Sequence, residues 1–170
     1  YDVDHENYTY LKIMPAGIIK TYEGRINGAL NASEKARHDR KSLNRFFKEL
    51  TKSLHDAEVK LLAGSDSGAF NSYTYPGISL HKELEAMVGI GMSPLDALQT
   101  SAYNGASFLK KESDYGTISV GKISDLVVLT ANPLDDIKNS RKISKVIKGN
   151  QVINPEIIAM ELDCLDCIEH

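Results

Sequence analysis

One carboxylate in this sequence stands where enzymes often do chemistry. Residues 60–63 form a short, mostly apolar run that ends in Gly64-Ser65-Asp66-Ser67-Gly68. The run is too short for a helix and glycine bounds it, so it predicts a buried strand with a sharp turn at its end. Asp66 would then lie at the C-terminal tip of a strand, where barrels and open α/β sheets bind ligands. The alternative is that Asp66 caps the turn through its own backbone, and the local pattern leaves both roles open.

Three aromatic residues follow this carboxylate closely in the chain. Phe70, Tyr73 and Tyr75 lie in the loop 69–77. Aromatic rings combine apolar area with polar groups, so they are suited to the wall of a substrate pocket beside Asp66. They are equally suited to packing over a neighbouring helix.

His81 follows the aromatic loop in the chain. It would lie in the first turn of the next helix, where it contacts substrate or bonds Glu85 one turn on. We favour a structural role for His81, supporting the site, over direct contact with substrate. Ser65 and Ser67 donate hydrogen bonds to a carboxylate or substrate, or they satisfy the turn itself.

Helices and strands that would position these residues can be read from periodicity. Residues 33–56 predict one amphipathic helix whose apolar face packs on a neighbouring layer, because large apolar residues recur at spacings of three and four: Leu43, Phe46, Phe47, Leu50 and Leu54. A second helix is predicted from Ile78, and Gly89 and Gly91 end it. A third is predicted to begin after the N-cap Ser93, with Pro94 at its first position, and to run towards Leu109. Residues 11–15 predict a short strand, and 16–30 a loop or weak helix.

The period changes to that of strands beyond Gly116. Residues 117–122 predict an approach turn and 123–130 a buried strand, while 143–147 and 151–153 form a hairpin. Three short strands stabilise one another poorly. Further partner strands are therefore expected.

Composition limits the classes of protein and partner. With 170 residues, 42% of them hydrophobic, the chain has enough material for one ordinary core. The net charge of -3, without a basic face, argues against nucleic acid and anionic membrane as partners. Neither an initiator Met nor a signal peptide is present, so we expect a piece of something longer, soluble and of undetermined localisation. Cys164 and Cys167 form a lone C-x-x-C, which favours a solvated tail over a redox or zinc role.

Five blocks in order carry a family resemblance across residues 61–152. They are GSDSG at 64–68, PGISLHKEL at 76–84, GMSPLDAL at 91–98, GTISVGKISDLVVL at 116–129 and NPL at 132–134. Together they resemble the C-terminal part of the amidohydrolase superfamily, in its imidazolonepropionase-like and Xaa-Pro dipeptidase (prolidase-type) branch. The resemblance implies an α/β fold: residues 1–115 end a TIM (β/α)8 barrel with strands seven and eight, 116–153 belong to a composite β-sandwich, and 154–170 are a tail.

The resemblance also implies a role for Asp66. In such enzymes the aspartate after the eighth strand binds a divalent metal, usually zinc, and shuttles the proton of the metal-bound water. Tyr73, Tyr75 and His81 would then border a small-molecule or dipeptide substrate with an amide, peptide or cyclic C–N bond. The family's other metal ligands come from earlier strands, and no H-x-H occurs in these 170 residues.

Because catalytic zinc needs about three protein ligands, we expect the chain alone to be inactive and to bind no metal stably. It would need the upstream barrel half, or would associate as a homo-oligomer through its open edges. Two other readings remain: a non-catalytic remnant, and an α/β-hydrolase with Asp66 as nucleophile. The loop with Pro76 counts against the second, since a nucleophile elbow enters its helix directly.

Overall fold

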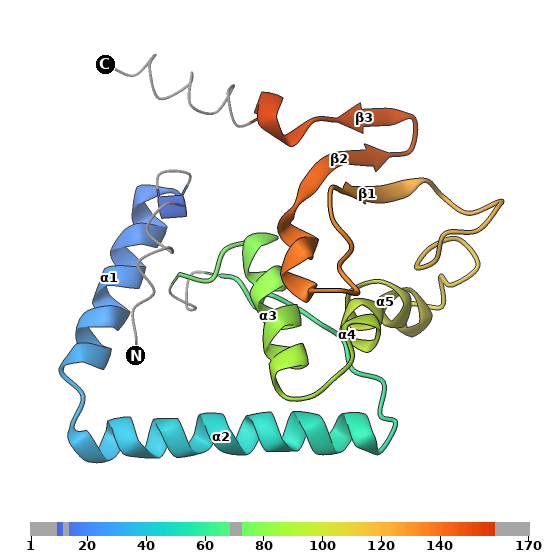
Figure 1. Ribbon diagram of the computed structural model, residues 1–170. Coiled ribbons are helices and arrows are strands. Elements are labelled where there is room, and N and C mark those ends of the chain that lie inside the picture. Colours follow the sequence, from blue (N-terminus) through green and yellow to red (C-terminus); the bar gives the residue numbers. More distant parts are fainter. Residues whose placement is uncertain (1–9, 12–13, 69–72, 159–170) are drawn as a thin grey trace, which may run out of the picture. The chain divides into compact units, whose positions relative to one another are not determined.

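The computed structural model describes residues 10–11, 14–68 and 73–158 (Figure 1). The chain divides into two compact units, Tyr1–Met92 and Ser93–His170, each with its own elements. The division expected from the family, after residues 115 and 153, rests on the resemblance and stays a prediction. Among the described residues, no helix is both long enough and apolar enough to cross a membrane.

The α-helices in the described residues of the first unit are α1 (Ala16–Leu30), α2 (Glu34–Asp56) and α3 (Ile78–Gly89). The helical alternative for residues 16–30 is thus the one observed. α2 confirms the long predicted helix, and its N-cap Ser33 accepts a hydrogen bond from the Ala36 N–H at 3.2 Å. The described ends of the predicted strand 11–15 form a turn, in which the Met14 N–H donates to the Leu11 carbonyl at 2.9 Å. Residues 12–13 lie outside the described residues.

α3 ends as its glycines predict. The N–H groups of Gly91 and Met92 donate to the carbonyls of Val88 and Met87, at 2.9 and 3.2 Å. This pair of bonds is a Schellman motif, which needs a left-handed residue, and Gly91 has φ +99°. α2 ends in the same hydrogen-bond pattern, but its left-handed residue is Glu58, with φ 57°.

The expected packing of α2 on a neighbouring layer is wrong for the described chain. α2 contains no buried residue. Its contact with the turn after α3 comes from the opposite, charged face: a Cβ placed on Gly91 would lie 3.1 Å from Lys52 Cε. The apolar face predicted to pack inward therefore stays exposed.

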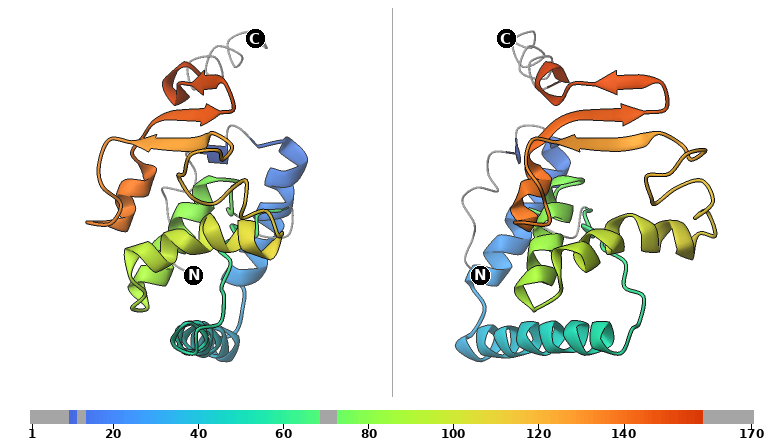
Figure 2. Two further views of the ribbon diagram at one scale, coloured as in Figure 1. Left: turned by 90° about the vertical axis from the view of Figure 1, so that its right-hand side faces the viewer. Right: turned by 45° about the vertical axis from the view of Figure 1, so that its right-hand side comes forward.

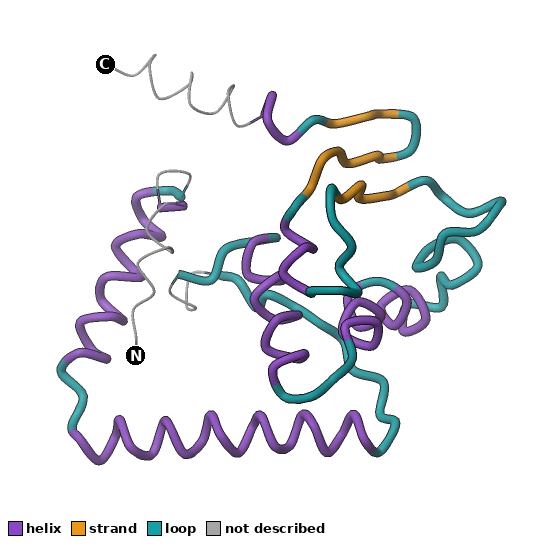
Figure 3. Tube along the Cα trace, in the orientation of Figure 1, coloured by secondary structure: helices purple, strands orange, loops and turns teal. Residues whose placement is uncertain are grey.

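The strand predicted at residues 60–63 is also wrong. The structure assigns loop to 59–67 (Figure 3). An extended segment becomes a strand only through a regular ladder with a neighbouring strand, and none of the ladders in the described part of the chain includes these residues. The apolar pattern identified an extended segment but could not supply its partner.

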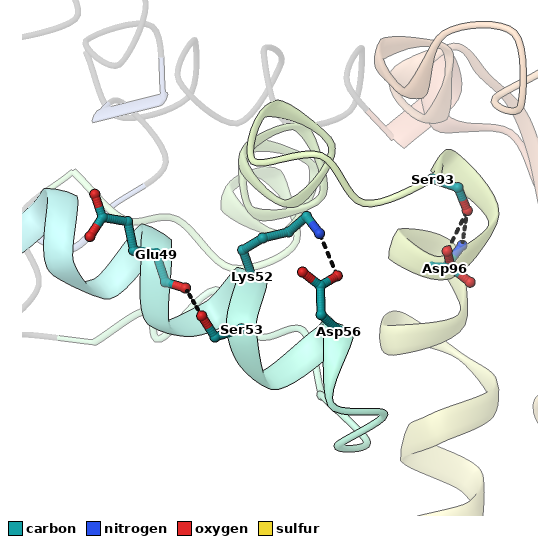
Figure 4. A network of polar contacts seen from close by, with 6 residues as sticks. All are labelled: Glu49, Lys52, Ser53, Asp56, Ser93 and Asp96. Carbon is teal, nitrogen blue, oxygen red and sulfur yellow. Dashed lines mark hydrogen bonds and ion pairs between the residues drawn. The ribbon is translucent and has the colours of Figure 1, made fainter.

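The second unit begins with α4 (Pro94–Ser101) and α5 (Tyr103–Phe108). Ser93 caps α4 as predicted: it accepts from the Asp96 N–H at 3.1 Å and donates to the Asp96 carboxylate at 2.6 Å (Figure 4). The single helix expected through Leu109 is interrupted at Ala102, which has φ -127° and ψ -77°. Hydroxyls at the end of α4 bond its last carbonyls, Thr100 to Ala97 and Ser101 to Leu98, and so compete with a continued helix.

The predicted strands form one antiparallel sheet in the order β1-β2-β3 (Figure 2). Its strands are β1 (Asp125–Leu129), β2 (Ile143–Lys148) and β3 (Gln151–Ile153), with the 3-10 helix η2 (Ile137–Arg141) before β2. Val146 is opposite Val127 in β1 and opposite Ile153 in β3. The hairpin is confirmed. The second sheet of a β-sandwich is not, since the described residues form this one sheet.

The approach to β1 is a loop held by one ammonium group. Lys122 Nζ donates to the carbonyls of Glu112 and Tyr115, at 2.7 and 3.4 Å, and to the Thr117 hydroxyl at 2.5 Å. Gly116, with φ +90°, turns the chain so closely that a Cβ there would meet Ala106 Cβ at 2.9 Å. This confirms the approach turn predicted at 117–122.

Candidate functional site

Asp66 is exposed and lies near the end of the loop 59–67. Its backbone has φ 48°, in the left-handed region that few residues other than glycine adopt. Asparagine and aspartate tolerate this region best, because their short side chains can bond the local backbone. The sharp turn predicted from Gly64 and Gly68 is not assigned here: neither glycine is among those with a positive φ, and the left-handed residue is Asp66 itself.

The two serines beside Asp66 bond each other. Ser65 Oγ donates to Ser67 Oγ at 3.1 Å, and both side chains are partly buried. Of the two roles that the sequence left open for them, this bond favours satisfying the turn. Asp66 itself is exposed, and its role as a site residue stays a prediction.

Four tyrosines gather into one aromatic cluster in the first unit. Tyr22 contacts Tyr73 at a ring-centroid distance of 5.5 Å and Tyr75 at 6.5 Å, and Tyr10 contacts Tyr75 at 5.5 Å. The interplanar angles of 49°, 72° and 59° are those of tilted and edge-on pairs, which the ring quadrupole favours. Two of the predicted pocket-wall residues, Tyr73 and Tyr75, are thus brought together. Phe70 lies outside the described residues.

Tyr73 and Tyr75, the two predicted pocket-wall residues, differ in their exposure to solvent. Tyr75 is 1% exposed, and its N–H donates to Ser79 Oγ at 2.8 Å in the first turn of α3. Tyr73 is half-buried. Tyr75 therefore packs as a core residue, and Tyr73 is the member of the pair with surface left for a ligand.

Tyr10 and Tyr22 were missed by sequence reasoning. Tyr22 is fully buried, and burial raises the pKa of its hydroxyl. A signal for it existed in α1, where Ile19, Tyr22 and Ile26 recur at spacings of three and four. Nothing comparable marks Tyr10, whose contact is made across the fold.

The helix after the aromatic loop carries His81 and Glu83, both half-buried. Burial raises the pKa of the Glu83 carboxyl, because desolvation disfavours its charged form. His81 lies in the first turn of α3, as expected. Glu83 was not singled out from the sequence.

A metal site is not complete in the described part of the chain. No group of three or more His, Cys, Asp or Glu side chains among the described residues is placed to hold an ion. Asp66 offers one carboxylate, whereas catalytic zinc takes about three protein ligands. Cys164 and Cys167 lie outside the described residues. The residues described here do not by themselves fit a divalent metal.

Comparison with protein families decides the relationship. The model of the amidohydrolase family matches residues 13–153, which include the Asp66 turn, the aromatic loop and the sheet. The chain belongs to the amidohydrolase family. This confirms the resemblance drawn from the five sequence blocks.

Two solved amidohydrolase-like structures show the same fold over much of the chain. A Xaa-Pro dipeptidase with methionine bound in its active site matches with a TM-score of 0.61 and 25% identity, covering 81% of this chain and 33% of that one. A protein assigned as a prolidase, from Bifidobacterium longum, matches with a TM-score of 0.53 and 30% identity, covering 66% of this chain and 28% of that one. A search of curated proteins finds no match.

These matches also show how much of an amidohydrolase is represented. The chain spans about a third or less of the length of the two structures. Its α/β content and its neighbours agree with part of a TIM barrel. The imidazolonepropionase-like character expected from the sequence stays a prediction.

Proposed function

We propose that this chain is the C-terminal part of a hydrolase of C–N bonds, and that Asp66 is its catalytic carboxylate. The family match and the two prolidase-type neighbours support the reaction class. An amide or a dipeptide is the substrate class we infer, by analogy with the Xaa-Pro dipeptidase and the prolidase.

Hydrolysis of a C–N bond needs a proton moved twice. A base takes a proton from the attacking water, and an acid gives a proton to the leaving amine, which departs poorly without it. One carboxylate can do both in turn. We assign this to Asp66, whose side-chain oxygens would hold the proton between the two steps.

A divalent metal, zinc in our expectation, would supply a more acidic water. In this proposal Asp66 contributes one carboxylate ligand. The other ligands must come from outside the described residues, because these hold no cluster of three suitable side chains.

The observation that carries the proposal is the family match over residues 13–153, a range that includes Asp66. Asp66 is exposed, and the flanking serines bond each other. The left-handed φ of 48° does not distinguish Asp66, because Glu58, Tyr73 and Lys110 have φ values of 57°, 58° and 56°.

We assign the substrate side of the site to Tyr73, with Tyr75 buried against the same Tyr22 ring and His81 as a supporting residue. Tyr73 is half-buried and contacts the ring of the fully buried Tyr22. Its partly exposed ring would offer an apolar surface to a substrate side chain.

The decisive test is Asp66→Asn in an enzyme assembled from this chain and the missing barrel half, joined genetically or mixed. Asparagine keeps the size and tolerates the turn, but it removes the basicity. Turnover of a dipeptide should fall by about 10²–10⁴-fold, the usual value of general acid–base catalysis.

Asp136→Asn is the matched control. Asp136 Oδ1 accepts from the Lys138 N–H at 3.0 Å as the N-cap of η2, and asparagine caps about as well. Its turnover should be unchanged. Near-normal turnover in Asp66→Asn would leave Asp66 as a turn residue and remove it from the mechanism.

The chain alone provides a second test. We expect no dipeptide hydrolysis and no stoichiometric zinc at sub-micromolar affinity, since about three ligands are needed. Tight zinc binding by the purified 170-residue chain would contradict this expectation. An inactive assembled enzyme would favour the remnant interpretation. The nucleophile-elbow alternative is disfavoured, because α3 begins at Ile78 and not directly after Gly68.

A further inference from the structure

α1 has a single buried side chain, the ring of Tyr22. Of the 15 residues of α1, all of them described, Tyr22 alone is buried, and it is 0% exposed. An aromatic ring is among the largest apolar surfaces that a side chain can bury. The position of α1 within the first unit is therefore tied to the contacts of this ring.

The Tyr22 ring contacts two tyrosines that differ in function. Tyr75 is 1% exposed and packs as a core residue, at a ring-centroid distance of 6.5 Å. Tyr73 lies closer, at 5.5 Å, and is half-buried, so part of its surface stays accessible. Tyr22 thus contacts the residue that we assign to the substrate side of the site.

The backbone of Tyr73 needs support from its surroundings. Its φ of 58° is unfavourable for a bulky side chain, and such a conformation persists where neighbouring contacts hold it. Glu58 and Lys110 have similar φ values, but they follow the ends of α2 and α5, where a left-handed residue reverses the chain. Tyr73 lies before α3 instead. The contact of its ring with Tyr22 contributes to offsetting this cost.

We propose that Tyr22 is a positioning residue for substrate binding. Its buried ring sets the orientation of Tyr73, and thereby the apolar surface that Tyr73 offers to a substrate side chain. The inference rests on the proposed function, because it takes Tyr73 as the substrate-side residue. Tyr22 is fully buried and acts through Tyr73 without touching substrate, so α1 contributes to specificity through this one contact.

Losing the Tyr22 ring should weaken substrate binding and leave the chemical step nearly intact. The test uses the enzyme assembled from this chain and the missing barrel half. Tyr22→Leu should raise the KM of a dipeptide with a large apolar side chain by about 2–10-fold, the usual value of an aromatic pair, with kcat nearly unchanged. The KM of a dipeptide of glycine, which lacks such a side chain, should change little. Tyr22→Phe keeps the ring and should keep the wild-type KM.

A second readout needs no activity. Tetranitromethane nitrates accessible tyrosines, and peptide mass spectrometry of the full chain locates the nitrated residues. Tyr115 of the second unit, which is 39% exposed, is the internal reference. Relative to Tyr115, nitration of Tyr73 should rise about twofold or more in Tyr22→Leu, because the ring contact is lost, and should be unchanged in Tyr22→Phe.

Leu84→Ala is the matched control. It also removes a buried apolar side chain from the first unit, 3% exposed, but leaves the four tyrosine rings in place. Its KM and its nitration of Tyr73 should match those of the wild type. Far-UV circular dichroism checks that each variant keeps its helices. If Tyr22→Leu unfolds, Tyr22→Met replaces it, since methionine fills irregular gaps without restoring the ring.

Several results would overturn the proposal. Unchanged KM and unchanged nitration in Tyr22→Leu, or equal effects in Leu84→Ala, would make Tyr22 an ordinary core residue. Altered nitration with unchanged KM would mean that Tyr73 does not bind substrate, and an equal loss in Tyr22→Phe would assign the effect to the hydroxyl.

Failure of the proposed function would look different. Near-normal turnover in Asp66→Asn, or an inactive assembled enzyme, would contradict that function. Nitration of the chain would still decide whether Tyr22 holds Tyr73 in place.

Discussion

α2 and α3 are both amphipathic helices of the first unit, and they differ in what covers them. α3 has 12 residues and buries Leu84 and Met87, which are 3% and 4% exposed. α2 has 23 residues, and its apolar and polar residues are separated more sharply onto opposite faces, yet none of its residues is buried. A periodic pattern therefore predicts that a helix face will be covered, but not what covers it.

The same two helices also end differently. Both use a left-handed residue to reverse the chain, Gly91 after α3 and Glu58 after α2. Glycine adopts this conformation freely, whereas a residue with a Cβ does not. α3 is thus adapted to its fold at both its face and its end, and α2 at neither within the described chain.

Alanine substitution at the two faces should give the largest contrast. Leu84→Ala leaves a cavity in a packed core and should lower the free energy of unfolding by about 2–5 kcal/mol. Leu50→Ala, at a residue 39% exposed, should lower it by less than about 1 kcal/mol. Urea unfolding measures both, and equal losses would mean that α2 packs as tightly as α3.

Exchanging the residue type at the two helix ends should give effects of opposite sign. Gly91→Ala forces a Cβ into φ +99° and should destabilise by about 1–2 kcal/mol. Glu58→Gly relieves φ 57° and should stabilise by less than about 1 kcal/mol, because glycine also raises the entropy of the unfolded chain. Thermal unfolding compares them. A silent Gly91→Ala would contradict the strain argument, since the flexible Lys52 side chain can move aside.

Removing the N-cap of a helix should show whether the loss of that helix also lowers the stability of the unit that contains it. Ser93→Ala and Ser33→Ala each lose a cap, which is worth about 1 kcal/mol. α4 buries Ala97, so its loss should lower the unfolding midpoint of the second unit. α2 has no buried residue, so Ser33→Ala should lower helix content while leaving the midpoint nearly unchanged. Far-UV circular dichroism during urea unfolding distinguishes the two.

Glu83 on α3 should make stability depend on pH in a modest way. Burial raises its pKa above the unfolded value of 4.5, so the folded state prefers the neutral acid. The stability that the neutral Glu83 carboxyl gives the folded state is fully present below pH 4.5, and it is lost as the pH rises through the raised pKa of Glu83. Glu83→Gln should therefore raise the melting temperature at pH 7 and have little effect at pH 4. A lower melting temperature at pH 7 would show that the charged form is the stabilising one.

Elements with local signals were predictable from the sequence. Ser33, Ser93 and Pro94 gave the starts of helices, Gly91 gave an end, and the hairpin before Gln151 followed from its turn. Such signals act within a few residues of their own position, so no knowledge of the fold is needed.

Features that depend on distant partners were not predictable. Residues 60–63 needed a neighbouring strand to become a strand themselves. At the candidate site, the contacts of Tyr10 and Tyr22 with the aromatic loop cross the fold. Periodicity carries no information about such pairs.

The loop held by Lys122 has a consequence for covalent modification. Three oxygens, from Glu112, Tyr115 and Thr117, converge on its ammonium group, which has three donors. Acetylation would remove the positive charge and leave one N–H for these three acceptors. The approach to β1 would lose these side-chain hydrogen bonds and keep its backbone bonds, such as that from the Ile123 N–H to the Asp114 carbonyl at 2.9 Å. Modification of this single amine would therefore act on the start of the β-sheet.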